Sequence, residues 1–598
     1  MKTSKTMTNL EIADLLRAVA ATYQLQDEVK NRYKIIAYER AADAVEHLSS
    51  ETKDIFDEGK LAEIPGIGEA IASHLSDIFN TGYSKHFNSL MRNIPQQVFE
   101  LMDLPRIGPK TAIKLVKYLK MEKSKNVLAD LEKLAQKGEI AKIEGFGQES
   151  QADILRALEE KRKMIKRHLL PYAYQIAQDY LDWLRKDKNV HEAEALGSLR
   201  RMASTVGDID IAVATKAPLR VIQRFISYKK VLRVSEKGEK TASVILPGGV
   251  QVDLMTQTPD SFGSLLQHFT GSKHHNIALR EHSQKQDLSL SEYGIRKTKN
   301  PNSAIQKFSE EKALYNYLGM DYIPPELRED SGEIEAALSR NIPQLVQLED
   351  IKGDLQIHSD FNTETSHDLG DSSIEEIICQ AEKLDYQYFA LTEHNPSHSG
   401  HNSQNICEIL KRKNEYVDKY NYSLSKDKTN RVIYIFNSLE IDILSNGELA
   451  IPEAAFKYLD FALVSIHSGF QQTKDKATQR ILQALSQPKV KILAHPSGRL
   501  LNKREGIEVD WPKVFAYCQQ QNKILEINAD PSRLDLPDFL VKEAISQGVK
   551  ISLGTDSHHF SSLENMIWGV NVARRGWCQK SDIINTLDLA DLKSLLLN

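Results

Sequence analysis

Two aspartates, Asp208 and Asp210, stand two residues apart in the segment GSLRRMASTVGDIDIAV, residues 197–213. A β-strand alternates its faces with a period of two, so both carboxylates project to the same side. An isolated pair of this kind is often a solvated strand end, but here the flank IAVAT is apolar. A third carboxylate, Asp253, lies in the similar run VQVDLM. Three carboxylates on neighbouring strands can hold two Mg²⁺ ions, which would activate an attacking oxygen and stabilise a leaving pyrophosphate.

The turn before the aspartate pair offers groups that bind phosphate. Gly197 and Ser198 supply backbone amides and a hydroxyl, and Arg200 and Arg201 supply guanidinium groups. Such donors match the oxygens of a phosphate chain. The segment therefore favours chemistry at phosphorus.

A second set of metal-binding residue types lies in the C-terminal half, where His, Asp and Glu follow short apolar runs. One histidine alone is usually structural, but this number of strand-terminal sites is difficult to explain by packing. Imidazole together with carboxylate suits Zn²⁺ or Mn²⁺, and a cluster of such ions activates water for phosphoester hydrolysis. The set comprises His358, His394, Glu440, His467, His495, Asp556 and His558.

The elements that must position these residues differ along the chain. Residues 8–165 repeat apolar positions three and four apart, as in NLEIADLLRAVAATYQL, which predicts helices. Residues 190–256 contain short β-rich runs, which predict a small sheet. From Gly353 onward, strand-like runs alternate with helical patterns. That alternation predicts a parallel sheet or barrel with its chemistry at the carboxyl ends of the strands.

Composition limits the class of protein. A length of 598 residues favours about four domains, and 41% hydrophobic and 27% charged residues are typical of a globular protein. No apolar window is long enough for a bilayer, and the first residues do not resemble a secretory signal. Four scattered cysteines predict a reducing, cytoplasmic location. Because the net charge is -5, any surface that binds nucleic acid must be a local one.

Glycine-containing breaks interrupt the helical region at IPGIG (64–68), LPRIG (104–108) and IEGFG (143–147). Glycine permits tight turns, and amides at the start of the next helix suit a phosphate. Plain helix connectors are the alternative interpretation, which the third and weaker break fits equally well. The first two share a hydrophobic-Pro-x-hydrophobic-Gly pattern, and this favours a functional role for them.

The aspartate segment, followed by FTGSKHHNIALR (269–280), resembles the family X DNA polymerases. The resemblance implies that Asp208, Asp210 and Asp253 are catalytic and bind two Mg²⁺ or Mn²⁺ ions. Ser204 departs from the family pattern because an acidic residue is expected there, and this predicts weaker support for Arg201. His268 replaces the aromatic residue of many relatives, which predicts altered sugar selection. The implied nucleotide-binding residues are Gly197, Ser198, Arg201, Gly207, Gly271, Asn276 and Arg280.

The breaks IPGIG and LPRIG resemble helix-hairpin-helix motifs, which bind the DNA backbone without reading its sequence. Some family X relatives carry a Schiff-base lysine and a phosphate-binding lysine in their first domain. Here His74 and Ala70 occupy those positions, so we expect no lyase activity. The residues implied to bind DNA are Gly66, Gly68, Arg106, Gly108, Lys110 and, at a 5′-phosphate, Arg40.

The C-terminal set resembles the polymerase and histidinol phosphatase (PHP) domain over residues 351–580. In bacteria this domain is commonly fused behind a family X polymerase, and it implies a 3′-5′ exonuclease with an Mn²⁺ or Zn²⁺ cluster. The resemblance adds one acidic ligand, for which Asp368 is favoured over Asp371 and Asp360 because it follows Ser366-His367. Gln356 replaces the first His of the family's His-x-His motif, and Glu393 replaces the usual Asp before His394. These changes predict reduced or lost nuclease activity.

The fold expected from these resemblances is multidomain, α+β and α/β. We expect a helical DNA-binding domain (1–95), a second helical domain (96–170), a nucleotidyltransferase palm like that of polymerase beta (171–257) and a thumb-like subdomain (258–325). A linker (326–350) and a PHP domain with a distorted (β/α)7 barrel (351–598) complete the expected order.

The predicted function is a DNA-directed DNA polymerase that fills short gaps in repair of the base excision type. Its expected partners are gapped or primer-template DNA and dNTPs, without a membrane, and the expected state is a monomer. One alternative is a metal-dependent phosphoesterase whose polymerase half only recruits DNA. Another is a non-catalytic scaffold that binds gaps.

Overall fold

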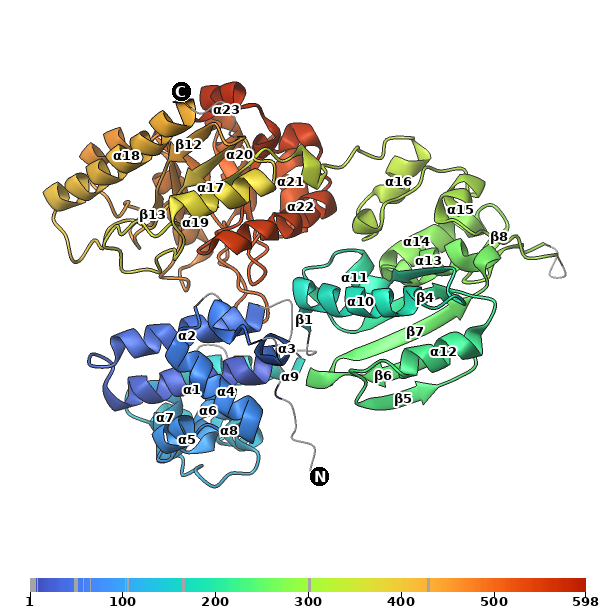
Figure 1. Ribbon diagram of the computed structural model, residues 1–598, viewed down its shortest axis with the longest axis horizontal. Coiled ribbons are helices and arrows are strands. Elements are labelled where there is room, and N and C mark those ends of the chain that lie inside the picture. Colours follow the sequence, from blue (N-terminus) through green and yellow to red (C-terminus); the bar gives the residue numbers. More distant parts are fainter. Residues whose placement is uncertain are drawn as a thin grey trace. The chain divides into compact units, whose positions relative to one another are not determined.

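The computed structural model describes residues 7, 9–47, 52–57, 59–64, 66–102, 104, 107–163, 167–299, 303–426 and 431–597 (Figure 1). The chain divides into two compact units. The first comprises Met1–Ala193, Val206–Ile211 and Ala217–Thr256, and the second comprises Glu194–Thr205, Ala212–Lys216 and Gln257–Asn598. No helix among the described residues is long and apolar enough to cross a membrane.

The N-terminal residues form the predicted helices, which are arranged around two apolar cores. One core includes Leu16, Leu75 and Phe87, and the other includes Leu115 and Leu131. The helices are α1 (Asn9–Asp27), α2 (Arg32–His47), α3 (Thr52–Asp57), α4 (Glu69–Thr81), α5 (Lys85–Met91), α6 (Gln96–Met102), α7 (Pro109–Tyr118), α8 (Val127–Gln136) and α9 (Gln148–Lys163).

The glycine breaks lie at the starts of helices. Gly68 is the residue before α4, and Gly108 is the residue before α7, where Pro109 occupies the first turn. Gly66 has a φ of +82°, a conformation that side chains with a Cβ rarely adopt. A Cβ at Gly66 would also lie 3.4 Å from the carbonyl oxygen of Arg40. The positive φ therefore favours glycine at this turn, whereas a Cβ there would make only an ordinary van der Waals contact.

The predicted small sheet has five strands in the order β2-β4-β7-β6-β5. Strands β5, β6 and β7 form an antiparallel meander in which Ser243 pairs with Asp253. Residues in β7 alternate between buried and more exposed, whereas β4 is buried throughout except at Asp210. The elements are α10 (Leu170–Arg185), β2 (Glu192–Ala195), α11 (Gly197–Arg200), β4 (Ile209–Ala214), α12 (Pro218–Ile226), β5 (Arg233–Lys237), β6 (Thr241–Ile245) and β7 (Gln251–Gln257).

The next segment, residues 262–338, is held by a buried network of charges. Glu311, which is 5% exposed, accepts hydrogen bonds of 2.6 Å from both Arg200 and Arg328. Arg200 also donates to the hydroxyl of Thr270 at 2.6 Å. Because burial of a charge is costly unless it is paired, these contacts stabilise one another. The elements are α13 (Phe262–Thr270), α14 (Lys273–Gln284), β8 (Leu288–Ser291), β9 (Gly294–Lys297), α15 (Glu311–Tyr317) and α16 (Glu333–Leu338).

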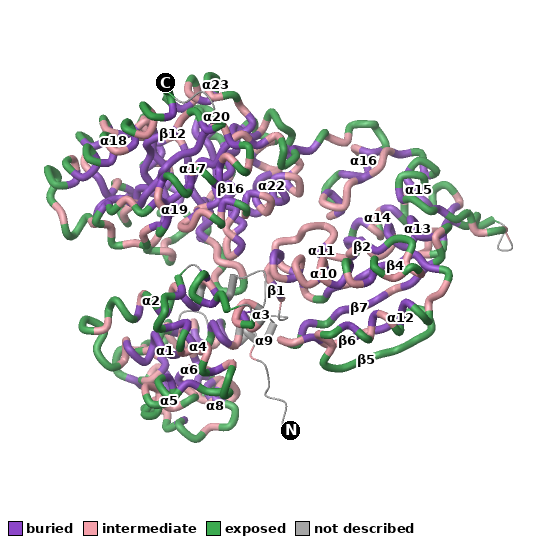
Figure 2. Tube along the Cα trace, in the orientation of Figure 1, coloured by how far each residue is buried: buried purple, intermediate pink, exposed green. Residues whose placement is uncertain are grey.

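The C-terminal part contains two parallel sheets whose strands follow chain order, β10-β11-β12 and β13-β14-β15-β16-β17. Helices lie outside these strands in Figure 1, and Figure 2 shows that the strands themselves are buried. Isolated parallel bridges join Ile357 to Ser557 and His394 to Glu440. The mixture of helix and sheet confirms the predicted fold class, while closure into a barrel stays a prediction.

The bounds of these elements agree with the predicted alternation of strands and helices. The strands are β10 (Gly353–Ile357), β11 (Tyr388–Leu391), β12 (Tyr434–Asn437), β13 (Glu440–Asp442), β14 (Ala462–Ser465), β15 (Val490–Leu493), β16 (Ile524–Asn528) and β17 (Lys550–Gly554). The helices are α17 (Ile374–Lys383), α18 (Ser403–Lys426), α19 (Lys474–Leu485), α20 (Trp511–Gln521), α21 (Asp538–Ser546), α22 (Met566–Arg575) and α23 (Leu589–Leu597).

A buried ion pair fixes α18 against the ends of β11 and β12. The ammonium of Lys413 lies 2.8 Å from Glu393 and donates to the carbonyls of Leu391 and Ser438. Glu393 also accepts a 2.5 Å hydrogen bond from the hydroxyl of Ser359. Both charged side chains are at most 2% exposed. The pair therefore ties the segment that ends in His394 to the rest of the C-terminal part.

We predict that Lys413→Met destabilises the C-terminal part by about 3–5 kcal/mol, because it leaves the Glu393 carboxylate buried without a cation. Urea unfolding followed by tryptophan fluorescence measures this, since Trp511, Trp568 and Trp577 all lie in that part. Lys411→Met, at an exposed position of the same helix, is the matched control and should change little. Equal stability of the two variants would contradict the structural role of the pair.

Two candidate metal centres

The first candidate centre comprises the three predicted aspartates. Asp208 precedes β4, Asp210 lies within it, and Asp253 lies in the neighbouring strand β7. One carboxylate oxygen from each residue lies within 4.8 Å of the others. The structure thus brings together the three carboxylates that the sequence singled out. Oxygen ligands in this number suit hard divalent cations such as Mg²⁺.

The electrostatics of this group favour a bound cation. Burial, together with the charges of Asp208 and Asp253, raises the pKa of Asp210 to about 7. A carboxylate whose ionised form is disfavoured by its like-charged neighbours gains stability when a cation neutralises the group. Gln251 donates to both oxygens of Asp253 at 3.1 and 2.9 Å, which orients that carboxylate. The residues therefore fit the divalent ions expected here.

The candidate nucleotide-binding residues around α13 and α14 are held by hydrogen bonds. The Asn276 side chain donates to the carbonyl of His268 at 2.7 Å and accepts from Gln267 at 2.9 Å. A guanidinium nitrogen of Arg280 lies 3.5 Å from the ring of His268. Gly271, between the two helices, has a φ of +65°. The position where many relatives have an aromatic residue thus contacts both candidate residues.

The remaining phosphate-binding candidates flank α11. Gly197 is its first residue and has a φ of +59°, and Ser198 follows within the same short helix. Arg201 lies directly after the helix, and its side chain is largely buried. A Cβ at Gly207, before β4, would lie 3.5 Å from a guanidinium nitrogen of Arg167.

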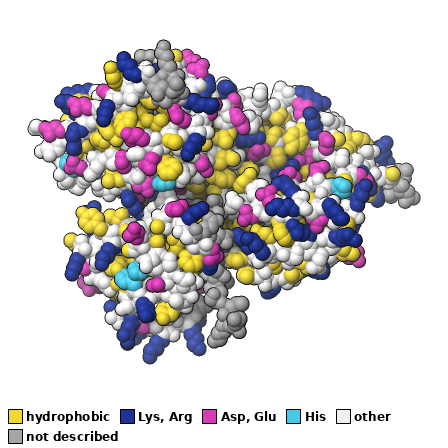
Figure 3. All heavy atoms as spheres, in the orientation of Figure 1, with side chains coloured by type: hydrophobic (Ala, Val, Ile, Leu, Met, Phe, Trp, Pro, Cys, Tyr) yellow, Lys and Arg dark blue, Asp and Glu magenta, His cyan; other side chains and the backbone are white. Residues whose placement is uncertain are grey.

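Exposed lysines follow one face of α7, the helix after the second glycine break. Lys110, Lys114 and Lys117 are spaced like successive turns of a helix and all are exposed. Lys and Arg side chains also gather at the lower edge of the helical part in Figure 3. Only Lys110 was singled out from the sequence, although the spacing of the other two could have been read there. Arg106 lies outside the described residues.

The position where relatives have a Schiff-base lysine is occupied by a stacked pair of imidazoles. The rings of His74 and His86 lie 4.5 Å apart and are nearly parallel. Burial and the neighbouring imidazole lower the pKa of His74. A neutral imidazole cannot form the carbon–nitrogen double bond that a lysine amine forms with a sugar aldehyde.

The second candidate centre is organised around Glu440, at the start of β13. Its carboxylate oxygens lie 3.4 Å from ring nitrogens of His358 and His394, 3.3 Å from His467 and 2.8 Å from His495. These histidines follow β10, β11, β14 and β15, so each stands at the carboxyl end of a parallel strand. Burial raises the pKa of Glu440, but the imidazoles outweigh it and hold that pKa well below its usual value.

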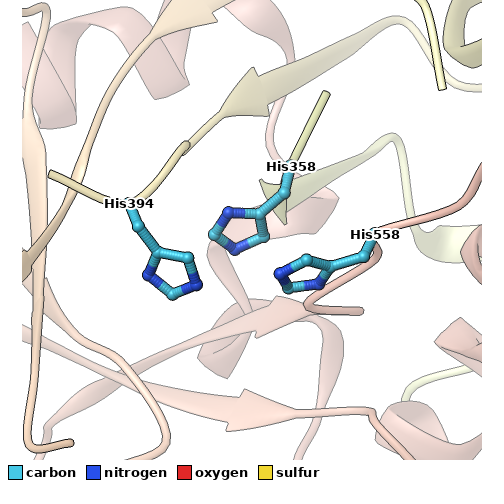
Figure 4. Close-up of side chains that lie close together, drawn as sticks. All are labelled: His358, His394 and His558. Carbon is cyan, nitrogen blue, oxygen red and sulfur yellow. The ribbon is translucent and has the colours of Figure 1, made fainter. Parts of the chain in front are cut away.

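Several ring nitrogens of this cluster make no hydrogen bond with the residues that the structure describes. Figure 4 shows His358, His394 and His558 with their rings close together, and the centroids of His358 and His558 are 4.2 Å apart. His394 Nδ1 and His558 Nε2 are buried without a hydrogen-bond partner among the residues that the structure describes. A buried polar atom without a hydrogen-bond partner lowers the stability of the folded state, and coordination of a metal ion would compensate for the missing hydrogen bond. The cluster therefore fits Zn²⁺ or Mn²⁺.

Gln356 is buried beside the cluster, but it is hydrogen-bonded within the protein. Its amide nitrogen donates to Glu440 at 3.1 Å, and its oxygen accepts from Asn528 at 3.3 Å. Asp556, which lies 3.2 Å from His358, also accepts from Asn528. The amide thus presents a donor to the central carboxylate where an imidazole would present a lone pair to a metal.

Sequence reasoning missed two members of this centre, His367 and Asp442. His367 forms a potential metal-binding group with His394 and His467, whereas the neighbouring Asp368, which we favoured, is exposed. Asp442 accepts hydrogen bonds of 2.7 Å from His367 and from His467. Its position two residues after Glu440 on the same strand face was the available signal. A metal role for Asp368 stays a prediction.

Arg533 is a further residue that the sequence did not single out. Its side chain is largely buried, and its Nε lies 3.4 Å from Asp556. Burial opposes its charge, but nearby carboxylates, Asp556 first among them, raise the pKa of Arg533. A fixed guanidinium beside a metal cluster is suited to bind a phosphate oxygen.

The two centres and the fold together define a nucleotidyltransferase of the polymerase beta type joined to a metal-dependent phosphoesterase. Family models match residues 7–84 (helix-hairpin-helix domain), 98–160 (SAM-like helix-hairpin-helix tandem) and 265–329 (DNA polymerase beta thumb). The chain is 32% identical to the DNA polymerase/3'-5' exonuclease PolX of Bacillus subtilis, across 98% of this chain and 99% of that protein. The chain belongs to this PolX family.

Other relatives match the two halves separately. DNA polymerase lambda of Rattus norvegicus is 24% identical over 54% of this chain and 56% of its own length. A probable phosphatase of Caldicellulosiruptor bescii is 27% identical over 31% of this chain and 74% of its own length. These likenesses confirm the predicted combination of a polymerase with a phosphoesterase of the PHP type.

We predict that Glu440→Gln strongly lowers the metal content of the second centre, because the amide removes the one carboxylate that contacts four imidazoles. The loss in metal affinity should be at least the 10- to 100-fold that is typical when a partner of the ligands is removed. Mass spectrometry of metal in the purified protein measures it, with the exposed Glu448→Gln as control. Equal metal content in wild type and Glu440→Gln would exclude Glu440 as the central ligand.

Proposed function

We propose that this protein is a template-directed DNA polymerase that fills short gaps and carries a 3′-5′ exonuclease in its C-terminal part. The observation that carries the proposal is the pair of separate metal centres within one PolX-family chain. The aspartate group has the oxygen ligands of a two-metal transferase, and the histidine cluster has the mixed ligands of a phosphoesterase. The distribution of ligand types therefore matches two reactions at phosphorus.

In the transferase reaction, the primer 3′-oxygen attacks the α-phosphorus of a dNTP, and the bond from that phosphorus to the oxygen bridging to the β-phosphorus breaks. Pyrophosphate leaves, and the hydroxyl proton passes to a base. Asp208 and Asp210 would hold both divalent ions, Mg²⁺ or Mn²⁺, which supply charge stabilisation at the attacking and leaving oxygens. Asp253 would be the carboxylate on the primer side, and Ser198 and Arg201 would bind the triphosphate.

In the hydrolytic reaction, water attacks the terminal phosphodiester of the primer, and the bond to the 3′-oxygen of the preceding nucleotide breaks. The residues that would hold Mn²⁺ or Zn²⁺ are those around Glu440 together with His558, and the ions would supply an activated water. Arg533 would bind a phosphate oxygen of the scissile group. Gln356 stands in place of one imidazole in this arrangement, and the groups around Glu440 and His558 would supply the remaining ligands.

We predict that Asp208→Ala abolishes dNTP-dependent growth of a 5′-labelled primer in a short gap. Loss of a metal ligand removes several kcal/mol of charge stabilisation, which corresponds to about a thousandfold or more in rate. Glu236→Ala, an exposed carboxylate in β5 of the same sheet, is the matched control and should extend normally. Normal extension by Asp208→Ala would instead support the interpretation that this half only recruits DNA.

We predict that Lys110→Ala/Lys117→Ala weakens binding to gapped DNA and reduces its dependence on salt. Each lysine that neutralises a phosphate contributes about 0.9 to the slope of log affinity against log salt concentration. Fluorescence anisotropy at several salt concentrations measures that slope. Lys474→Ala/Lys476→Ala, on the exposed face of α19, is the control. An unchanged slope in the α7 variant would exclude this lysine face from DNA binding.

A further inference from the structure

Arg201 is held by a carboxylate far from it in sequence. Its Nε lies 2.9 Å from Glu329 Oε1, and its Nη1 donates to the carbonyl of Thr270 at 2.5 Å. The family resemblance leads one to expect an acidic residue at position 204, but that residue is Ser204. The carboxylate that supports Arg201 in this chain is therefore Glu329, the last residue of the segment matched by the thumb family model.

The same Glu329 oxygen also binds an arginine from the C-terminal part. Arg575, the last residue of α22, lies 3.0 Å from Glu329 Oε1 through its Nη1. That nitrogen also donates to the backbone carbonyl of Arg201 at 2.6 Å. The other terminal nitrogen of Arg575 lies 2.6 Å from Asp538, at the start of α21. Arg575 is thus linked to Arg201 in two ways. It donates directly to the Arg201 backbone carbonyl, and its guanidinium shares the Glu329 carboxylate with that of Arg201.

These contacts all lie within one compact unit, and both guanidinium groups are largely buried, while the Glu329 side chain is 32% exposed. Residues 194–205 and 257–598 belong to that unit. The side chains of Arg575 and Arg201 are only 9% and 13% exposed. Ion pairs in such surroundings are screened less by salt than surface pairs are, and removal of one partner leaves a charge without compensation.

A second arginine of the C-terminal part reaches the same loop. Arg499 Nη2 lies 3.5 Å from the hydroxyl of Ser204, and Arg499 Nε donates to the carbonyl of Arg533 at 2.9 Å. Serine at position 204 therefore faces a guanidinium group. The residue that departs from the family pattern stands at a contact between the Arg201 loop and the C-terminal part.

We propose that Arg575 is a positioning residue for nucleotide binding, through which the phosphoesterase part holds Arg201 ready for a dNTP triphosphate. The inference rests on the proposed role of Arg201 in binding that triphosphate. Arg575 shares the charge of Glu329, so Glu329 does not bind Arg201 alone, and it also anchors the Arg201 backbone. Without Arg575, the carboxylate would retain the Arg201 guanidinium, and the loop would lose an anchor. Both effects weaken binding of the nucleotide.

The test compares single-nucleotide gap filling by Arg575→Met and wild type over a range of dNTP concentrations. We expect the dNTP KM to rise about three- to tenfold in Arg575→Met, with kcat within about twofold, which is the pattern for a lost ground-state contact. Shortening of the same primer without dNTPs should be unchanged. Arg575→Lys keeps the charge but lacks the second nitrogen, so an intermediate KM is expected.

Arg574→Met is the matched control on the same helix. Arg574 binds Glu326 at 2.9 Å and the carbonyl of Val346 at 3.1 Å, so its loss perturbs the same region without removing the Glu329 contact. If Arg574→Met raised the dNTP KM as much as Arg575→Met does, the effect would be a general structural one and the inference would be overturned. If Arg575→Met does not fold, Glu329→Gln takes its place, because the amide keeps the shape of the side chain and removes its charge.

Arg201→Met separates this inference from the proposed function. If Arg201→Met raises the dNTP KM and Arg575→Met does not, the positioning role is wrong while the role of Arg201 stands. If neither substitution changes the dNTP KM, the triphosphate-binding role proposed for Arg201 is itself wrong, and the inference is overturned with it.

Discussion

The cost of burying a carboxylate governs this structure. A carboxylate removed from water must be paired, protonated or bound to a metal, and different carboxylates of this chain favour different solutions. Lys413 pairs with Glu393, and two arginines pair with Glu311, where the role is structural. Around Glu440 the partners are imidazoles with nitrogens suited to a metal. Burial and the neighbouring aspartates raise the pKa of Asp210, which favours a bound cation.

The structural ion pairs also determine where the reactive groups stand. The Lys413–Glu393 pair fixes the end of β11, which carries His394, and Asp442 orients both His367 and His467. In the thumb segment, Glu311 holds Arg200 against Thr270, whose carbonyl in turn receives Arg201. Each site therefore depends on paired charges that do not themselves take part in chemistry. Hydrogen-bonded supports of this kind are what keep reactive groups in position.

The predictable parts of the molecule are those encoded locally. Helix periodicity, the glycine breaks and the runs that end in His or Asp all lie within short segments, so the elements and the two ligand sets could be proposed from sequence. Contacts between segments that are distant in the sequence could not be proposed in this way. Neither the pairing of Glu329 with Arg201 and Arg575 nor the position of Lys413 leaves a local pattern. The sequence did not single out His367, because neighbouring loop residues differ in the direction of their side chains, which only the fold decides.

The central claim is that two separate metal centres perform two reactions on the same primer. The most direct test follows one 5′-labelled primer in a short gap, with Mn²⁺, in wild type, Asp208→Ala and Glu440→Gln, each with and without dNTPs. We expect that Asp208→Ala loses primer growth and keeps shortening, while Glu440→Gln keeps growth and loses shortening. If either variant lost both growth and shortening, the assignment of one reaction to each centre would be contradicted. It would also be contradicted if both variants kept both activities.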